Sequence, residues 1–395
     1  MYPSLRLKKH EDRRLRTGHA WVYSNEVDVK QTPLADFEPG DVVQIQDARG
    51  KTLGMAYVNP ATLICARLYS RRLNQPLDQA FFIKRLRQAL ALRELVFSRP
   101  FYRLVYGESD GLPGLVVDRF DSVLVVQITT AGMEQIRDSI VDALETVLQP
   151  AVILLRNDSP ARELEGLASY TETVLGHLPE RVDLEENGTR FQAPLAGGQK
   201  TGWYYDHRLN RQRLQAYVKN RQVLDVFSYI GAWGVQALQA GANRVTCVDG
   251  SETFLRIAQD NAALNGHADA LTTLTGDAFE ILKELREQGE HYDVVVLDPP
   301  AFIKRRKDIK KGSVAYQRIN QLAMQLLHPG GLLVSASCSW HFRRSELLES
   351  MRKAAAISGQ SLQIMEQGHQ GPDHPVHPAM RETDYLKAYF ARVGR

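Results

Sequence analysis

The second half of the chain alternates short apolar runs with amphipathic segments of helical period. The apolar runs predict strands that begin at Val223, Arg244, Tyr292 and Leu332, and a further strand that ends at Gly276. Helices are expected between them, over 236–240 and 251–265. Strands that alternate with helices predict a parallel, doubly wound α/β sheet, in which ligands bind at the carboxyl ends of the strands.

The first 190 residues follow a different pattern. Strands are expected over 20–23, 41–46 and 63–68, with turn residues between them, so residues 1–72 predict a compact barrel or sandwich. A helical period covers 77–97, and strands ending at Phe120 and covering 123–129 precede a helix over 134–148, which predicts an α+β domain. We therefore expect three domains, over 1–72, 73–190 and 191–395. Three acidic residues of the middle domain are interpreted as turn residues without chemistry: Glu108, Asp110 and Asp118.

Acidic residues stand at the ends of the predicted parallel strands. The run Val223–Gly234 meets Asp225 and ends in a glycine-spaced turn that lets the backbone pass close to a ligand. Asp249 ends the next strand at the spacing from which a carboxylate reaches ribose hydroxyls, and Asp277 could meet an adenine amine. A Rossmann dehydrogenase would share these features. The rigid strand end Asp298-Pro-Pro300, which presents an acid or a carbonyl toward a planar base, instead favours an S-adenosylmethionine methyltransferase.

One cysteine lies at the end of a predicted strand. Leu332–Ser339 is an apolar run that places Cys338 at its carboxyl end, beside the same cleft. Carbon 5 of cytosine or uracil becomes nucleophilic only after a thiolate adds to carbon 6, and a cysteine thiol suits this step. The alternative is a buried structural thiol. Cys65 and Cys247 lie inside strands and are interpreted as structural.

Composition narrows the class of protein. The chain has 395 residues, 44% hydrophobic and 24% charged, as in globular domains, with no apolar run long enough to span a membrane and no signal segment. A cytoplasmic protein is expected. Three scattered cysteines predict neither a disulfide framework nor a zinc site. The net charge of +3 is small, but residues 1–72 hold 12 Lys and Arg against 8 Asp and Glu.

Basic residues cluster at two places. One cluster lies in 8–16, and the other combines 304–311 with Arg343 and Arg344, on both sides of the predicted cleft. Such clusters bind phosphates, although a solvated face is the alternative for each. Phe302 either stacks on an extruded base or packs in the core. The polar loop 197–208 is interpreted as a ligand contact, with an interdomain loop as the alternative.

These motifs together resemble the RlmI-type 23S rRNA 5-methylcytosine methyltransferases over almost the entire chain. The matching segments are His19–Ser24, Gly107–Gly114, Lys200–Arg208, Asp225–Tyr229, Asp298–Phe302, Ser337–Ser339 and Asp373–Pro375. The chain departs from the family pattern at Ala301, where lysine is common, and at Ile230-Gly-Ala232, where Thr-Gly-Gly is common. Related guanine methyltransferases share the Asp-Pro-Pro segment but lack the cysteine.

The resemblance implies an N-terminal PUA domain, a central α+β domain and a Rossmann-like methyltransferase domain. It also implies an RNA substrate, with Cys338 as nucleophile. The leading hypothesis is methylation of carbon 5 of a cytosine in large-subunit rRNA, in which Asp298 orients or protonates the cytosine edge. The residues expected at S-adenosyl-L-methionine are Lys200, Thr201, Asp225, Phe227, Ser228, Tyr229, Gly231, Asp249, Asp277, Ala278 and Asp298. Those expected at RNA are Lys8, Lys9, Arg13, Arg14, Lys304, Arg305, Arg306, Arg343 and Arg344.

Two other functions stay open from the sequence. Guanine N-methylation needs no thiol, and an RNA-binding assembly factor would keep the fold without catalysis. The sequence identifies neither the methylated nucleotide nor the base that removes the carbon 5 proton. The oligomeric state, with a homodimer as one option, and the role of Asp373-His374-Pro375 are left open too.

Overall fold

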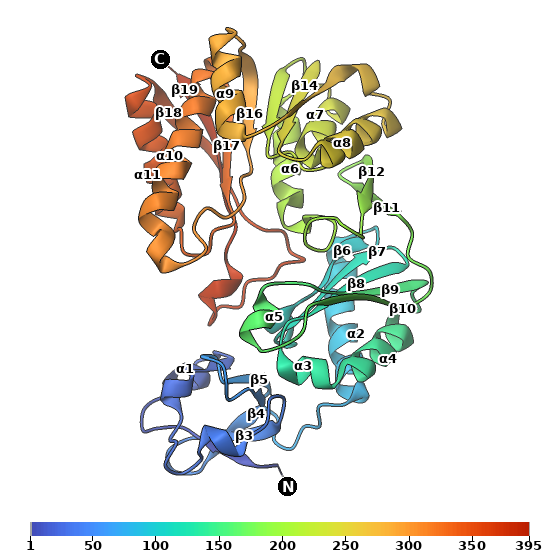
Figure 1. Cartoon of the computed structure of the whole chain (residues 1–395), viewed down its shortest axis with the longest axis vertical. Coiled ribbons are helices and arrows are strands. Elements are labelled where there is room, and N and C mark those ends of the chain that lie inside the picture. The colour runs from blue at the N-terminus through green and yellow to red at the C-terminus, as the bar shows by residue number, and fades with distance from the viewer. Residues whose placement is uncertain (1, 395) are drawn as a thin grey trace. The chain divides into compact units, whose positions relative to one another are not determined.

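The computed structural model describes residues 2–394 and divides them into two compact units. The first unit contains the chain up to Val182 together with Pro194–Tyr205 and Pro372–Thr383. The second contains Asp183–Ala193, Asp206–Gly371 and the chain from Asp384 onward. Figure 1 shows the elements of each unit in chain order. The domain boundaries at 72 and 190 remain predictions.

A five-stranded sheet forms the N-terminal module of the first unit, in the order β1-β3-β4-β5-β2. Its strands are β1 (Ser4–Arg6), β2 (Trp21–Val22), β3 (Val42–Gln46), β4 (Thr52–Val58) and β5 (Ala66–Ser70), with the short helices α1 (Arg13–Arg16), η1 (Ser24–Glu26) and η2 (Leu34–Asp36). Strand β4 was not predicted, because Gly54 interrupts its apolar pattern. The structure explains this glycine: a Cβ there would lie 2.6 Å from the carbonyl oxygen of Ser70.

The central sheet of the first unit has the order β10-β9-β8-β7-β6 and is antiparallel except between β8 and β9. Its strands are β6 (Phe101–Tyr106), β7 (Leu115–Phe120), β8 (Val123–Ile128), β9 (Val152–Asn157) and β10 (Tyr170–Leu175). The helices are α2 (Gln79–Val96), α3 (Ala131–Gln135), α4 (Arg137–Leu148), α5 (Ala161–Leu164) and the turn η3 (Gly107–Asp110). The predicted α+β pattern is therefore present. Tyr57 joins the two sheets, because it packs in the central core and donates a 2.6 Å hydrogen bond to the carbonyl of Pro113.

Buried ion pairs hold the remaining segments of the first unit in place. Asp118 lies within β7 rather than in a turn, and it pairs with Arg103 at 2.8 Å and accepts a hydrogen bond from Thr201. Asp373 is fully buried; its carboxylate accepts a hydrogen bond from the backbone of Arg103, and its carbonyl accepts one from Arg93. The Asp373-His374-Pro375 motif, whose role was open, thus anchors Pro372–Thr383 to the central sheet.

The second unit is built on a seven-stranded sheet of order β15-β14-β13-β16-β17-β19-β18, parallel except for β19. The strands are β13 (Gln222–Val226), β14 (Arg244–Asp249), β15 (Leu271–Thr275), β16 (Tyr292–Leu297), β17 (Leu327–Ser337), β18 (Ser361–Gly368) and β19 (Lys387–Gly394). The helices are α6 (Arg208–Leu214), α7 (Ala232–Gln239), α8 (Glu252–Leu264), α9 (Ala278–Glu287), α10 (Ile309–Gln325) and α11 (Arg344–Ile357). The predicted doubly wound α/β sheet is confirmed.

Helices cover both faces of this sheet. Helices α9, α10 and α11 share one apolar core with alternate residues of the strands, and Figure 1 shows α7 and α8 on the other side. The hairpin β11 (Arg181–Glu186) and β12 (Thr189–Pro194) precedes the sheet. The short helical turns η4 (Tyr205–His207), η5 (Gln215–Tyr217), η6 (Ala268–Ala270), η7 (Arg306–Asp308) and η8 (Arg381–Thr383) complete the elements. No described helix is both long and apolar enough for a membrane span.

Candidate active site

The carboxyl edge of the seven-stranded sheet collects the residues that the sequence placed at strand ends. In spatial order these are Asp277 after β15, Asp249 at the end of β14, the turn after β13, Asp298 after β16 and Cys338 after β17. Neighbouring strands lie about 5 Å apart, so the five strand ends span about 20 Å, which is enough for a nucleoside-sized ligand and a second planar ring beside it. One edge therefore brings the thiol together with the predicted cofactor residues of the second unit.

The turn after β13 has an unusual backbone. Phe227 and Tyr229 have φ angles of 66° and 50°, and Gly231 has 79°, so the chain passes through the left-handed region at three positions within five residues. The backbone N–H of Tyr229 donates to the carboxylate of Asp249 at 2.9 Å and keeps the turn in this conformation. Strain of this kind in non-glycine residues is characteristic of ligand sites, because the surrounding structure must hold it. Ser228, at the same turn, is buried.

Asp225 is the buried carboxylate beneath this turn. Its Oδ2 accepts a 2.9 Å hydrogen bond from the backbone of Gly234, whereas Oδ1 has no partner among the described residues. Burial raises the pKa of Asp225 to about 7, with smaller contributions from Asp298 and Asp249. An orphan buried acceptor of this kind fits a cationic ligand. S-adenosylmethionine carries a sulfonium and an ammonium group beside one carboxylate, so the carboxylate acceptor at this turn fits the cations of the cofactor.

The other expected cofactor residues of the second unit have local roles as well. Asp249 also accepts a 3.0 Å hydrogen bond from the backbone of Ser251, and burial raises its pKa. Asp277 is exposed and caps α9 by accepting hydrogen bonds from the backbone of Phe279 and Glu280. Ala278 is buried behind it. One oxygen of Asp277 thus stays available at the strand end.

Asp298 is held by two side chains that the sequence did not identify. His207 Nε2 lies 3.2 Å from Oδ1, and the indole Nε1 of Trp233 donates to Oδ2 at 3.0 Å. Asn210 lies 3.2 Å from the other imidazole nitrogen. Although burial opposes ionisation, His207 and Trp233 lower the pKa of the Asp298 carboxyl, so the group is a carboxylate at neutral pH. Its side chain stays 21% exposed and therefore reaches the edge.

Cys338 is partly exposed, and a hydrogen-bonded network fixes both of its neighbours. Ser337 Oγ donates to the hydroxyl of Tyr316 at 2.8 Å, and that hydroxyl lies 3.0 Å from Ser339 Oγ. Ser339 Oγ also accepts a 3.2 Å hydrogen bond from the backbone of Ile303, which follows the Asp-Pro-Pro segment. Tyr316 therefore joins the turn that carries the thiol to the loop that carries Asp298.

Lys387, at the start of β19, is the cation beside this thiol. Its Nζ donates to the carbonyl oxygens of Ser339 and Tyr385, both at 2.6 Å, and the side chain is buried. Burial lowers the pKa of Lys387 to about 8, and Cys338 partly offsets that effect. The ammonium and the thiol thus interact electrostatically.

Phe302 forms part of an aromatic wall. Its ring centroid lies 4.9 Å from Tyr316, 6.1 Å from Phe279 and 6.3 Å from Phe227. The half-buried ring packs against the core of the second unit. Of the two interpretations of Phe302, packing in the core matches the contacts of the ring.

Two expected cofactor residues lie in the first unit. Thr201 is buried and donates to Asp118, and Lys200 is exposed with Nζ 4.5 Å from the centroid of Tyr204. The hydrogen bond from Thr201 to Asp118 holds the loop that carries them within the first unit. A cofactor contact by Lys200 or Thr201 remains a prediction.

Some of the basic residues expected at RNA form ion pairs or hydrogen bonds within the protein, and others are exposed. Arg14 pairs with the buried Glu26 at 2.6 Å, and Arg344 donates to the carbonyls of Gly368 and Leu386. Both guanidinium groups thus stabilise their own units. The exposed members are Lys8, Lys9, Arg13, Lys304, Arg305, Arg306 and Arg343. Their contact with RNA remains a prediction.

Comparisons with known proteins identify the family and the fold. Residues 162–391 match the S-adenosylmethionine-dependent methyltransferase model, and residues 5–71 match the PUA-like domain model. The chain belongs to the S-adenosylmethionine-dependent methyltransferase family. Relatives named ribosomal RNA large subunit methyltransferase I include one from Salmonella arizonae, 38% identical over 99% of this chain and 98% of that one. Another, from Vibrio cholerae, is 38% identical over the full length of both chains.

Solved structures show the same fold. A methyltransferase crystallised as a complex with SAH has a TM-score of 0.85 at 22% identity and covers 99% of this chain and 100% of its own. A SAM-dependent methyltransferase from Streptococcus mutans has a TM-score of 0.83 at 21% identity, with the same coverage. The expected cofactor, S-adenosyl-L-methionine, and the PUA-like plus methyltransferase fold are confirmed.

Proposed function

We propose that the protein methylates carbon 5 of a cytosine in large-subunit rRNA, with 23S rRNA as the expected substrate, and that Cys338 is the nucleophile. The observation that carries the proposal is the placement of Cys338 directly after β17, beside the strand end that holds Asp298 and on the cofactor edge. The rRNA substrate is supported by relatives at 38% identity that are named ribosomal RNA large subunit methyltransferase I. A methyltransferase acting on guanine nitrogen would not need a thiol there.

The covalent step follows from the chemistry of the thiolate. The sulfur of Cys338 adds to carbon 6 of cytosine, and the electron pair of the 5,6 double bond moves to carbon 5. S-adenosylmethionine would supply an electrophilic methyl group when bound, with S-adenosylhomocysteine as the leaving group. After carbon 5 is methylated, its proton leaves to a base, the carbon–sulfur bond breaks, and the double bond and the thiolate are restored. Cys338 is unchanged after the cycle.

The charges around the thiol support these roles. Lys387 supplies the positive charge that favours the thiolate, since an adjacent cation lowers the free energy of the anion. Asp298 is ionised, so it orients cytosine by accepting a hydrogen bond from the exocyclic amine rather than by protonating the ring. His207 and Trp233 hold that carboxylate in position.

The test is a trap for the covalent adduct. Large-subunit rRNA fragments that contain 5-fluorocytosine should form a denaturation-resistant complex with the wild-type protein, because fluorine blocks release from carbon 5. Cys338→Ala should form no complex and transfer no methyl group, while it binds S-adenosylmethionine normally in calorimetry. Cys65→Ala, which changes a buried thiol of the N-terminal module, is the matched control and should keep the complex.

Other outcomes distinguish the alternatives. Methyl transfer that survives Cys338→Ala and yields a methylated guanine would replace the proposal with guanine N-methylation. Absence of measurable S-adenosylmethionine binding by the wild-type protein would favour a non-catalytic assembly factor. Mapping of 5-methylcytosine in rRNA from cells with and without the protein would identify the nucleotide.

A further inference from the structure

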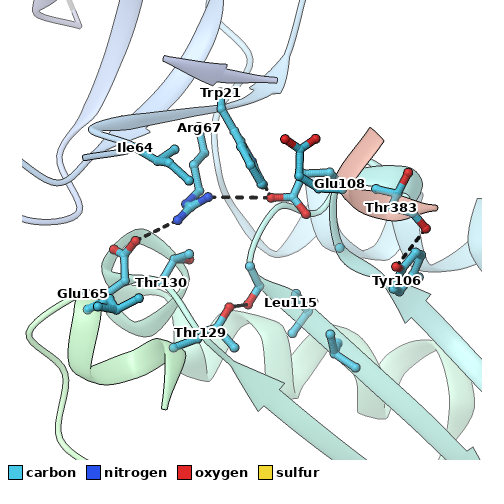
Figure 2. A pocket seen from close by; sticks show the side chains of 16 residues that line it. Trp21, Ile64, Arg67, Tyr106, Glu108, Leu115, Thr129, Thr130, Glu165 and Thr383 are labelled. Atoms are coloured by element: carbon cyan, nitrogen blue, oxygen red, sulfur yellow. Dashed lines mark hydrogen bonds and ion pairs between the residues drawn. The ribbon is translucent and has the colours of Figure 1, made fainter. Parts of the chain in front are cut away.

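The first unit contains a cavity of about 340 Å³ between the N-terminal module and the central sheet (Figure 2). Trp21 and Arg67 reach it from β2 and β5, where they are direct partners across the two strands. Glu108, Glu165 and Glu382 bring three carboxylates to its wall. This cavity is separate from the carboxyl edge of the seven-stranded sheet, because all of its lining residues belong to the first unit.

Hydrogen bonds hold the flat side chains of the cavity in fixed positions. The indole Nε1 of Trp21 donates to Glu108 Oε1 at 2.7 Å, and the Arg67 guanidinium lies 5.5 Å from the indole centroid. Arg67 also pairs with Glu165 at 2.9 Å and with Glu108 at 3.8 Å. Figure 2 shows Trp21, Arg67 and Glu108 joined in this way. The cavity therefore offers a preorganised planar surface.

Two of the carboxylates retain free acceptor capacity. Both oxygens of Glu165 are used, by Arg67 on one side and by Asn59 and the backbone of Ala131 on the other. Glu108 uses only Oε1, and Glu382 makes neither a hydrogen bond nor an ion pair with the described residues. Three carboxylates against one guanidinium give the lining a formal charge of −2. Such a lining repels phosphate and attracts N–H donors.

We propose that this cavity binds an unpaired guanine base of the RNA. The proposal rests on the proposed function only for the premise that RNA is the substrate. Unpaired bases are recognised by stacking on aromatic or guanidinium planes and by hydrogen bonds to their edges, and Trp21, Tyr106 and Arg67 provide such groups. Leu164, which is 80% exposed, adds apolar surface at the rim.

The preference of the cavity for one base depends on which hydrogen-bonding groups the edge of that base presents to a carboxylate. Guanine places two N–H donors, on N1 and on the exocyclic amine, side by side, so a carboxylate accepts from both. Adenine and cytosine place a ring acceptor beside their amine, and uracil places its single N–H between two carbonyls. A carboxylate repels each of these lone pairs, so guanine is the preferred occupant.

Basic side chains next to the cavity suit the RNA backbone. Arg14 Nη1 lies 3.1 Å from His19, and the His19 ring lies 5.8 Å from Trp21, so one side chain separates Arg14 from the cavity wall. Lys8, Lys9 and Arg13 are exposed in the same N-terminal segment. Phosphates would remain on this basic surface while the base enters the acidic cavity.

The test uses the full-length protein and single-stranded oligouridylates that carry one central guanine, inosine or adenine. Fluorescence anisotropy at fixed salt should show the guanine oligonucleotide binding about tenfold or more tightly than the inosine one, which lacks the exocyclic amine. Glu382→Gln should abolish this preference. Glu38→Gln, which changes an exposed glutamate elsewhere in the first unit, is the matched control and should retain it. Cys338→Ala should retain it too.

Equal binding of all oligonucleotides would overturn the guanine site while leaving RNA binding intact. Failure to bind any of them would overturn the site together with its RNA premise. Competition by N-acetylarginine amide, but not by guanosine, would show that the cavity accepts a basic side chain instead, which also overturns the proposal.

Discussion

The hydroxyl of Tyr316 accepts a 2.8 Å hydrogen bond from Ser337, the residue before the proposed nucleophile. Tyr316 comes from the middle of α10 and Ser337 from the end of β17, so a helix positions the strand end that carries Cys338. Burial raises the pKa of Tyr316 to about 12, and the hydroxyl therefore stays protonated at neutral pH.

Tyr316→Phe should lower kcat for methyl transfer by roughly tenfold or more while the affinity for S-adenosylmethionine changes little. Both serine hydroxyls lose a buried partner, which costs about 1 to 3 kcal/mol and loosens the turn that carries the thiol. Single-turnover methyl transfer and calorimetry measure the two effects. Tyr389→Phe is the control, because that hydroxyl binds the carbonyl of Arg344 instead. Equal losses in both variants would contradict a specific role for Tyr316.

The buried Lys387 should give stability a recognisable pH dependence. Its pKa is lowered from 10.5 to about 8 on folding, so the charged form is the one that folding disfavours. Below pH 8 this cost is present in full, and it disappears as the pH rises from about 8 toward 10.5. The free energy of unfolding of the wild type should therefore rise relative to Lys387→Met over this range, by up to about 3 kcal/mol. Urea denaturation at several pH values measures the difference, and parallel curves would refute the burial effect.

Asp225 should couple cofactor binding to proton release. Its folded pKa of about 7 lies above the unfolded value, so ionisation of the empty protein near neutral pH costs stability, and a bound cation offsets that cost. The affinity for S-adenosylmethionine should rise at least about threefold between pH 6 and pH 8. Calorimetry in buffers of different ionisation enthalpy detects the released proton.

The matched variants for this prediction are Asp225→Asn and Asp277→Asn. The first removes the titrating group and should flatten the pH profile. The second changes an exposed carboxylate whose helix-capping role asparagine can keep, so its profile should match that of the wild type. A flat wild-type profile would contradict the placement of a cation at Asp225.

His207 should control the ionisation of Asp298. The imidazole lies 3.2 Å from the carboxylate and is the largest of the groups that lower its pKa. His207→Gln should therefore move the acid limb of the pH–rate profile to higher pH, because the pKa of Asp298 rises when the imidazole is removed. His267→Gln, near the exposed C-terminal end of α8, is the control. If the acid limb does not shift in His207→Gln, the ionisation of Asp298 does not control the rate.

Local patterns were sufficient for much of the second unit. The strand predicted over Arg244–Asp249 matches β14, and Asp249, Asp298 and Cys338 lie at or directly after strand ends as expected. These features could be predicted because a buried parallel strand is a continuous apolar run, and its end is marked by the first polar residue. The resemblance to known enzymes then connected the row of strand ends with S-adenosylmethionine.

The contacts around Asp298 and Cys338 depended on the tertiary structure. His207, Trp233, Tyr316 and Lys387 are separated from their partners by tens of residues, and neither hydrophobic period nor turn chemistry marks them. The same holds for Asp373, which accepts a hydrogen bond from the backbone of Arg103 in β6, 270 positions earlier. Periodicity reports only which face of an element is buried. Which distant side chains meet there is decided by strand order and by packing of the folded chain, so only the structure could show it.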